Sequence, residues 1–426
     1  MAYNVPNGWS GGCPCGGSSS SVLPVTIGGT NTDAFGRIRV SQPYTLFDSQ
    51  QRYDLDWAFY SNTASGGNIT FVGAQSTANL QVTNTVGSFA ARESRYVFTY
   101  QPGKSQLVLV TFVMAPANGN LRQRVGYFGK ENGYFLELRD QLYLVERSNV
   151  TGVITESYVP QSAWNADTFT GYGPSGISLD ITCSQIFWLD MEWLGVGTVR
   201  TGFVINGQFY VAHYFHHANS FKNVYITTAT LPVRYEIQTL AGGAPATSNL
   251  LQICCSVQSE GGYDQPLLLF SNISSFSNNM TAGTWYPAMS IRLKSGRLDG
   301  VAQIRQVDVV MTSADTIHWA LWSNVTTTDL IGENFVSNPQ SAAVEIDTTA
   351  GAITTTRCQQ VAAGIISGTN QSAASMSLEL IKYFSQIGRN SFTQTSDIFT
   401  LAYYSTVTVT GHPVQIQGLL SWNEVI

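Results

Sequence analysis

The sequence predicts an all-β protein with two β-sandwich domains in succession, and three observations favour this fold class. Short runs that alternate apolar and polar residues, or that are rich in β-branched and aromatic residues, recur along most of the chain. Gly, Asn, Asp and Pro separate these runs at intervals of about 8–12 residues, the spacing typical of a sandwich. The chain has 426 residues, so we expect more than one domain.

Local patterns refine this prediction. The pairs Asn132-Gly133 and Asn206-Gly207 lie between apolar runs, and Asn-Gly is the strongest short signal for a tight hairpin turn. Residues 375–388 have a helical pattern that Gly388 would end, although two strands and a turn fit the same residues. The clearest strands are QLVLVTFVM (106–114), GYFLELR (133–139), IFWLDMEW (186–193) and VAQIRQVDVVM (301–311).

The chain divides by composition into four parts. Residues 1–30 contain GGCPCGGSSSSV and predict a flexible docking arm, because Gly and Ser cannot build a core. Residues 31–84 predict an extended wrapping segment followed by the first strands. A sandwich is expected over 85–240, and the sequence LAGGAPATSN predicts a boundary near 240–248. A second β-domain is expected over 248–426.

The composition is apolar but poor in charge. Hydrophobic residues make up 43% of the chain and charged residues only 11%, less than half the usual share of charge. Such a surface suits a protein that is largely buried in an assembly. The net charge is −6 without a basic patch, which argues against nucleic acid as a partner. We also expect no membrane insertion and no secretory signal, so synthesis in a cytoplasm is expected.

The six cysteines do not follow the spacing of a zinc site. Cys13 and Cys15 lie in the Gly-rich arm, where they predict either an inter-subunit disulfide or an inert arm. Cys183, Cys254 and Cys255 are expected to be small buried apolar residues. We expect no metal and no cofactor.

Several ordered blocks of the sequence resemble uncharacterised structural proteins of tailed bacteriophages. The resemblance implies a virion component that is made in the host cytoplasm, assembles with other virion proteins and has no catalytic activity. The blocks are DAFGRIRVSQPYTLFD (33–48), RYVFTYQPGKSQLVLVTFVM (95–114), VGYFGKENGYFLEL (125–138), SQIFWLDMEWLGVGTVRTGFVINGQFYVAHYFHHAN (184–219), ITTATLPVRYEI (226–237) and LQICCSVQSEGG (251–262).

One predicted strand places Trp188, Asp190 and Glu192 on a single face, because side chains alternate along a strand. The pattern resembles the catalytic strand of family-16 glucanases, which have Glu-x-Asp-x-Glu on one face. This resemblance implies a concanavalin-like jelly roll over 85–240. Trp188 stands where the nucleophilic carboxylate would be, so we expect no glycosidase. The three side chains are candidates for glycan contact, with Trp188 as a platform for a sugar ring.

A structural alternative is that these acids pair with Arg124, Arg200 or Arg234. His213, His216 and His217 also lie close in sequence, but they lack the His-Glu-x-x-His pattern of a zinc protease. These histidines are expected at the end of a strand, in an interface.

Two functions remain open. The first is a structural role as an external accessory of the phage tail, baseplate, collar or capsid, acting through protein–protein assembly as a homo-oligomer, with a trimer expected. The second is a lectin-like virion protein that binds host surface glycan. Neither role requires catalysis.

Overall fold

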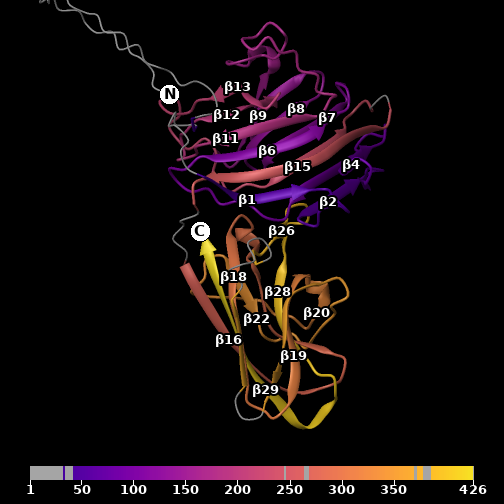
Figure 1. Cartoon of the computed structure of the whole chain (residues 1–426), viewed down its shortest axis with the longest axis vertical. Helices are drawn as coiled ribbons and strands as arrows, with labels where there is room; N and C mark the ends of the chain where they lie inside the picture. The colour runs from indigo at the N-terminus through magenta and orange to yellow at the C-terminus, as the bar shows by residue number, and fades with distance from the viewer. Residues whose placement is uncertain are drawn as a thin grey trace, which may run out of the picture.

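The computed structural model describes residues 32–33, 42–243, 246–262, 268–368, 372–377 and 385–425. These residues form two β-sandwiches that stack end to end along the long axis of the molecule (Figure 1). Every pair of neighbouring strands is antiparallel, as the registers of the strongest pairs show. The predicted all-β fold class and its two sandwiches are confirmed.

The first sandwich consists of two sheets. Sheet one has eight strands, in which β1 lies beside β15. Its strands, in spatial order, are β13 (Gln208–Phe215), β12 (Val199–Ile205), β11 (Gln185–Met191), β6 (Gln106–Val113), β15 (Ser248–Glu260), β4 (Thr77–Val82) and β3 (Asn68–Val72), with β1 (Pro43–Gln50). Sheet two contains β10 (Thr155–Pro160), β9 (Leu142–Ser148), β8 (Gly133–Leu138), β7 (Leu121–Phe128), β14 (Val233–Thr239), β5 (Phe89–Ser94) and β2 (Phe59–Ala64).

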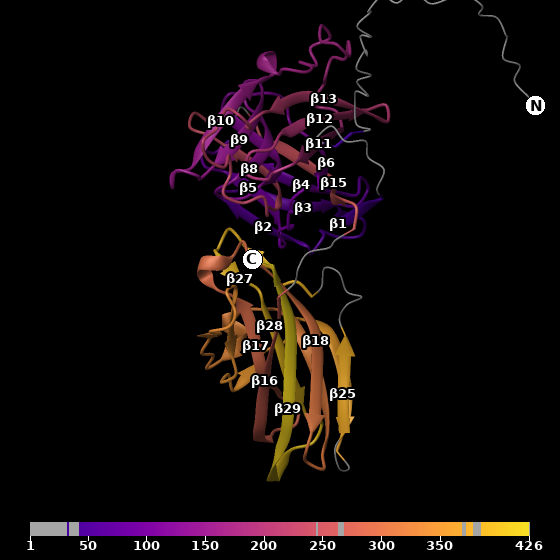
Figure 2. The same cartoon turned by 90° about the vertical axis from the view of Figure 1, so that its left-hand side faces the viewer.

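The second sandwich also has two sheets, and Figure 2 shows β29 running along its length beside β16 and β18. Sheet three is β16 (Leu268–Met280), β29 (Val409–Val425), β18 (Val301–Met311) and β25 (Ser372–Ser377). Sheet four is β20 (Leu330–Ile331), β23 (Ala352–Ile353), β17 (Trp285–Leu293), β28 (Ile398–Tyr404), β19 (Thr316–Val325) and β24 (Gln359–Ser367), with β21 (Val336–Ser337) and β22 (Val344–Asp347). The small pair β26 (Arg389–Asn390) and β27 (Thr395–Ser396) and three 3-10 turns, η1 (Gln161–Ala163), η2 (Ser295–Arg297) and η3 (Thr327–Asp329), complete the described elements.

Strict alternation in the sequence explains why these strands form a sandwich. In β6, Val108, Val110 and Phe112 are buried in the core, while the residues between them lie on the outer face. Both predicted hairpins form: β12 and β13 meet at Asn206-Gly207, whereas β7 and β8 are joined by residues 129–132, and Gly133 already pairs with Phe128. Asn206 and Gly207 have φ angles of 53° and 75°, the left-handed conformation that such turns require.

The domain boundary that we predicted near 240–248 is wrong. Strand β15 begins at Ser248 and pairs with β4, β6 and β1, so the first sandwich continues to Glu260. The strand before this segment, β14, and the strand after it, β15, both belong to the first sandwich, so no domain boundary falls there. Strands β1 to β4 lie in the range 31–84, where we expected a wrapping segment and the first strands, and all four are members of the two sheets.

Of the two interpretations of residues 375–388, a helix or two strands with a turn, the described part contains strand and no helix. Residues 375–377 belong to strand β25, and residues 378–384 lie outside the described part of the chain. The arm at 1–30 lies outside the described residues as well. In the described part of the chain, no helix is long and apolar enough to cross a membrane.

A polar network joins the two sandwiches. The Tyr60 hydroxyl in β2 donates a hydrogen bond to Asp397, and Arg95 lies 3.7 Å from the same carboxylate. Arg389 in β26 pairs with Glu93 in β5 at 3.2 Å. Partly or fully buried charges of opposite sign therefore hold the junction in one geometry.

Candidate functional site

Strand β11 shows the predicted alternation for Trp188 and Asp190, but it ends at Met191, so Glu192 lies beyond the strand. Leu189 and Met191 belong to the core of the first sandwich, while Trp188 and Asp190 lie on the outer face of sheet one. The alternation therefore brings the aromatic and the acidic residues of this strand together.

Asp190 forms an ion pair with an arginine of the neighbouring strand. Arg200 in β12 lies 2.7 Å from the Asp190 carboxylate, and the Ser105 hydroxyl donates a second bond to Asp190. Arg200 also donates to the backbone carbonyl of Thr32, so residues ahead of the first strand lie against this face. Of the three arginines that we considered as partners, Arg200 is the one that pairs with Asp190.

The candidate glycan contacts are closed to solvent. Trp188 is 1% exposed, and Asp190 and Glu192 are 0% exposed. The Trp188 ring packs edge-on against Phe209 with 5.6 Å between ring centroids, and the Tyr100 hydroxyl lies 3.4 Å from Glu192. A sugar cannot reach any of these side chains in this conformation, so the predicted glycan contact has no accessible surface here.

The histidines do not converge on a common point. His213 is buried, and a backbone amide donates to its Nδ1 at 3.1 Å; burial, with a smaller effect from His216, lowers the pKa of His213 to about 4. His217 instead contacts Glu146 at 2.8 Å and the Gly197 carbonyl at 2.5 Å. Among the described residues, no cluster of three His, Cys, Asp or Glu side chains could hold a metal ion.

The cysteines are only partly as expected. Cys255 is buried and Cys254 is half-buried, but Cys183 is exposed and lies against Asp180. The expectation that Cys183 fills an apolar core is therefore wrong. Cys13 and Cys15, the candidate inter-subunit disulfide, lie outside the described residues.

Charge is concentrated on the outer face of sheet two. Arg124 lies 2.5 Å from Glu137 and 3.8 Å from Glu236, and all three side chains are almost fully buried. Burial alone would raise the pKa of Glu236, but Arg234, Arg124 and Arg122 outweigh it and lower the pKa to about 2. We call this set the arginine–glutamate face: Arg122, Arg124, Arg139, Arg147, Arg234, Glu93, Glu137, Glu156 and Glu236.

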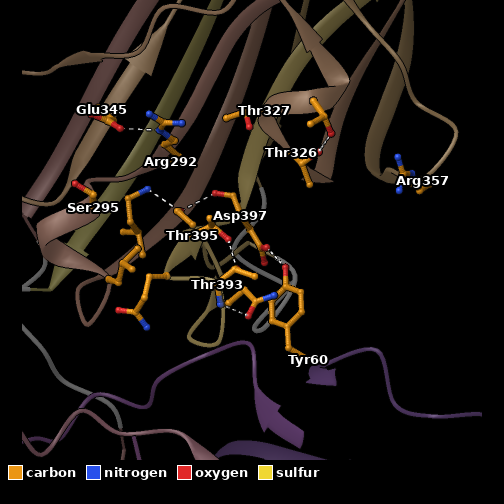
Figure 3. A pocket seen from close by; sticks show the side chains of 16 residues that line it. Tyr60, Arg292, Ser295, Thr326, Thr327, Glu345, Arg357, Thr393, Thr395 and Asp397 are labelled. Carbon is orange, nitrogen blue, oxygen red and sulfur yellow. Dashed lines mark hydrogen bonds and ion pairs between the residues drawn. The ribbon is translucent and has the colours of Figure 1, made fainter. Parts of the chain in front are cut away.

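A polar pocket of about 550 Å³ lies at the junction of the sandwiches (Figure 3). Its size is within the range of small-molecule sites in proteins. Twelve of its sixteen lining residues have a hydroxyl, amide or guanidinium group. The residues are Tyr60, Arg292, Leu293, Ser295, Leu298, Thr326, Thr327, Thr328, Glu345, Arg357, Asn390, Thr393, Gln394, Thr395, Ser396 and Asp397.

Most of these groups come from loops. Thr326, Thr327 and Thr328 lie at η3, where the hydroxyls of Thr326 and Thr328 are 2.8 Å apart. Thr393 comes from the turn between β26 and β27 and Thr395 is the first residue of β27, with their hydroxyls 2.7 Å apart. Sequence reasoning missed this pocket, although the three consecutive threonines are a visible excess of hydroxyls in a loop.

Both carboxylates of the junction pocket are engaged. Glu345 in β22 accepts a hydrogen bond from Arg292 in β17 at 2.6 Å. Asp397 accepts the Tyr60 hydroxyl, and burial raises the pKa of Asp397 although Arg95 opposes that shift. Figure 3 shows Tyr60 reaching Asp397 and shows Arg357 standing apart from the Arg292–Glu345 pair.

Arg357 is the cation of this pocket that is available to a ligand. Its side chain is exposed, and it forms no ion pair with the described residues. A guanidinium presents five N–H donors in a planar fork, so Arg357 can donate to several ligand oxygens at once.

A second cavity of about 640 Å³ lies beside sheet one. Residues of β3, β4, β6 and β15 line it together with residues 115–118. Asn79, Asn118 and Asn249 line it together with Val113 and Leu251, and none of its lining residues is ionisable. This cavity can offer amide hydrogen bonds and apolar contact, but no acid–base chemistry.

Comparison with known proteins gives structural similarity alone. No protein-family model matches the chain, and no curated protein matches it. A glycoside hydrolase family protein from Mycobacterium thermorestibile is 10% identical, with a TM-score of 0.36 over 50% of this chain and 99% of that one. A family-16 protein of the Bacteroides ovatus mixed-linkage glucan locus has a TM-score of 0.34 at 9% identity, over 50% of this chain and 99% of that one. The carbohydrate recognition domain of Emp47p has a TM-score of 0.32 at 9% identity, over 52% of this chain and 98% of that one.

Proposed function

We propose that this chain binds a carbohydrate without cleaving it, and that the ligand occupies the junction pocket. The observation that carries the proposal is the lining of that pocket, in which hydroxyl, amide and guanidinium groups surround a space of about 550 Å³. Sugars are recognised by such planar and hydroxylic groups, because each ligand hydroxyl both donates and accepts. Seven of the lining residues are Ser or Thr.

The ion pairs and hydrogen bonds of the nearby carboxylates support binding without hydrolysis. Glycoside hydrolysis needs two carboxyl groups that flank the scissile bond, one as the acid and the other as the base or nucleophile. In the junction pocket, Glu345 is paired with Arg292, and Asp397 is occupied by Tyr60 and Arg95. On β11, Asp190 is paired with Arg200 and has no access to solvent.

Glycan binding by the full-length chain tests this proposal. A glycan array should show binding to a limited set of structures, and Arg357→Ala should weaken it about 10–100-fold, the effect of one or two hydrogen bonds from a charged group. Arg52→Ala removes an exposed arginine outside the pocket and should leave affinity unchanged. If Arg357→Ala bound the glycan with full affinity, the ligand would not occupy this pocket.

Two further outcomes would contradict the proposal. Absence of binding to every glycan on the array would remove carbohydrate as the ligand. Release of reducing sugar from a bound polysaccharide would contradict the non-catalytic role.

A structural role in a tailed-phage particle is the second candidate function. The sequence blocks that resemble phage structural proteins support this role. The described parts of those blocks form strands of the first sandwich, such as β6, β8, β11 and β15. The second sandwich lies outside the resemblance. In this role the glycan would belong to the host surface, and the partners would be other virion proteins.

Mass spectrometry of purified particles and immunogold labelling tests the second role. Antibodies against the second sandwich should label the outside of intact particles at a fixed position. Absence of the chain from particles would contradict a virion role while leaving glycan binding untouched.

A further inference from the structure

Strand β16 forms an open edge of sheet three. Among the described strands it pairs with β29 alone, and Figure 2 shows it at the border of that sheet. The strand has 13 residues, LLFSNISSFSNNM, and contains no charged residue and no proline. Proteins usually protect long edges with charges, proline or bulges, because the unpaired N–H and C=O groups invite another strand.

The side chains of this edge are also unprotected. Leu269 is 69% exposed and Ile273 is 62% exposed, with Ser271 between them on the same outer face. Ile273 lies opposite Leu419 of β29, so the apolar surface continues into the sheet. By contrast, edge strand β10 of the first sandwich carries Glu156 and ends at Pro160.

The backbone groups that point outward can be assigned. The Ile273 amide donates to the side-chain oxygen of Asn272 at 3.0 Å, and we infer from this bond that the amide points away from β29. Backbone groups alternate in direction along an antiparallel strand, so Leu269 and Ser271 also point their N–H and C=O groups away from the sheet. These are the groups that an added strand would bond.

We propose that β16 is an interface between two copies of this chain, which pair their β16 strands antiparallel about a twofold axis at Ser271. In this register Leu269 of one copy lies opposite Ile273 of the other, so both exposed aliphatic pairs become cross-strand neighbours. The two four-stranded sheets join into one continuous sheet. Because β16 carries no charge, its pairing with an identical strand brings no like charges together.

The proposed interface is isologous, since the same surface serves both copies. This interface would make the protein a dimer, whereas the sequence led us to expect a trimer. No residue of β16 lines the junction pocket, so the glycan proposal and the dimer proposal are tested independently.

Sedimentation of the purified full-length chain tests the dimer. We expect dimers at micromolar concentration, and Ile273→Lys should weaken dimerisation at least tenfold by placing two ammonium groups at the interface. Ile365→Lys changes an equally exposed isoleucine on edge strand β24 and should leave the dimer intact. A monomeric or trimeric wild type, or dimers that persist in Ile273→Lys, would overturn the proposal.

Disulfide crosslinking tests the register. Ser271→Cys places two thiols beside the axis, and mild oxidation should produce a covalent dimer above the wild-type background of native cysteines. Ser275→Cys is the matched control, because Ser275 is an exposed serine on the same face. In this register its two copies lie about 26 Å apart, at about 3.3 Å per residue, and should not crosslink. Crosslinking of Ser275→Cys without Ser271→Cys would reject the register.

Discussion

Replacing Asp190 with alanine is expected to lower the free energy of unfolding by about 3–5 kcal/mol and to leave glycan affinity unchanged. The substitution leaves the buried Arg200 guanidinium without the carboxylate that lies 2.7 Å from it. An uncompensated buried charge costs far more than the loss of one exposed ion pair. Urea denaturation of the full-length chain, followed by tryptophan fluorescence, measures the effect, and the transition of the first sandwich should shift while that of the second stays in place.

Two variants separate the structural role of Asp190 from a functional one. Asp140→Ala removes an exposed carboxylate and should change stability by no more than about 0.5 kcal/mol. The double variant Asp190→Ala, Arg200→Ala should recover part of the loss, because neither charge is then buried alone. If Asp190→Ala kept full stability and lost glycan binding, the strand would be a ligand site.

Glu236→Gln is expected to have an effect of similar size, about 3–5 kcal/mol, because Glu236 serves several arginines at once. Arg234 lies 2.6 Å from its carboxylate, Arg122 lies 3.5 Å away and Arg124 lies 3.8 Å away. Loss of the negative charge leaves these side chains to repel one another in a buried setting. Glu131→Gln changes an exposed glutamate and serves as the control.

The lowered pKa of Glu236 predicts how its contribution to stability changes with pH. The folded pKa of Glu236 is about 2, below its usual 4.5, so the folded state favours the ionised form. Its contribution to stability is complete above the usual pKa and is lost as the pH falls from about 4.5 to about 2. Urea midpoints measured between pH 6 and pH 2.5 should fall less steeply in Glu236→Gln than in the wild type. An equal fall in both proteins would contradict the role of Glu236.

The sequence predicted features that alternate or that sit in short turns. The two faces of β11 followed from period-two alternation, and the Asn132-Gly133 and Asn206-Gly207 hairpins followed from turn chemistry. Both are local properties, which a single sequence contains in full.

Long-range features were not accessible in the same way. The sequence before β15 has the composition of a linker, and only the pairing of β15 with β1, β4 and β6 shows that the first sandwich continues beyond it. The burial of Trp188 depends on packing with Phe209 and on the surroundings of Arg200. The junction pocket combines Tyr60 with loops more than 200 residues later, and loop hydroxyls have no periodicity to reveal it.

The position of β28 and β29 in the second sandwich has a consequence for the order of folding. β28 lies between β17 and β19 in sheet four, and β29 lies between β16 and β18 in sheet three. Both sheets therefore lack a central strand until residues 398–425 have left the ribosome. The first sandwich needs only residues up to Glu260, so it can fold during synthesis, whereas the second must fold afterwards. During that delay β16 has no partner strand, and β17, β18 and β19 each lack one of their two neighbours, so chaperone binding would be concentrated there.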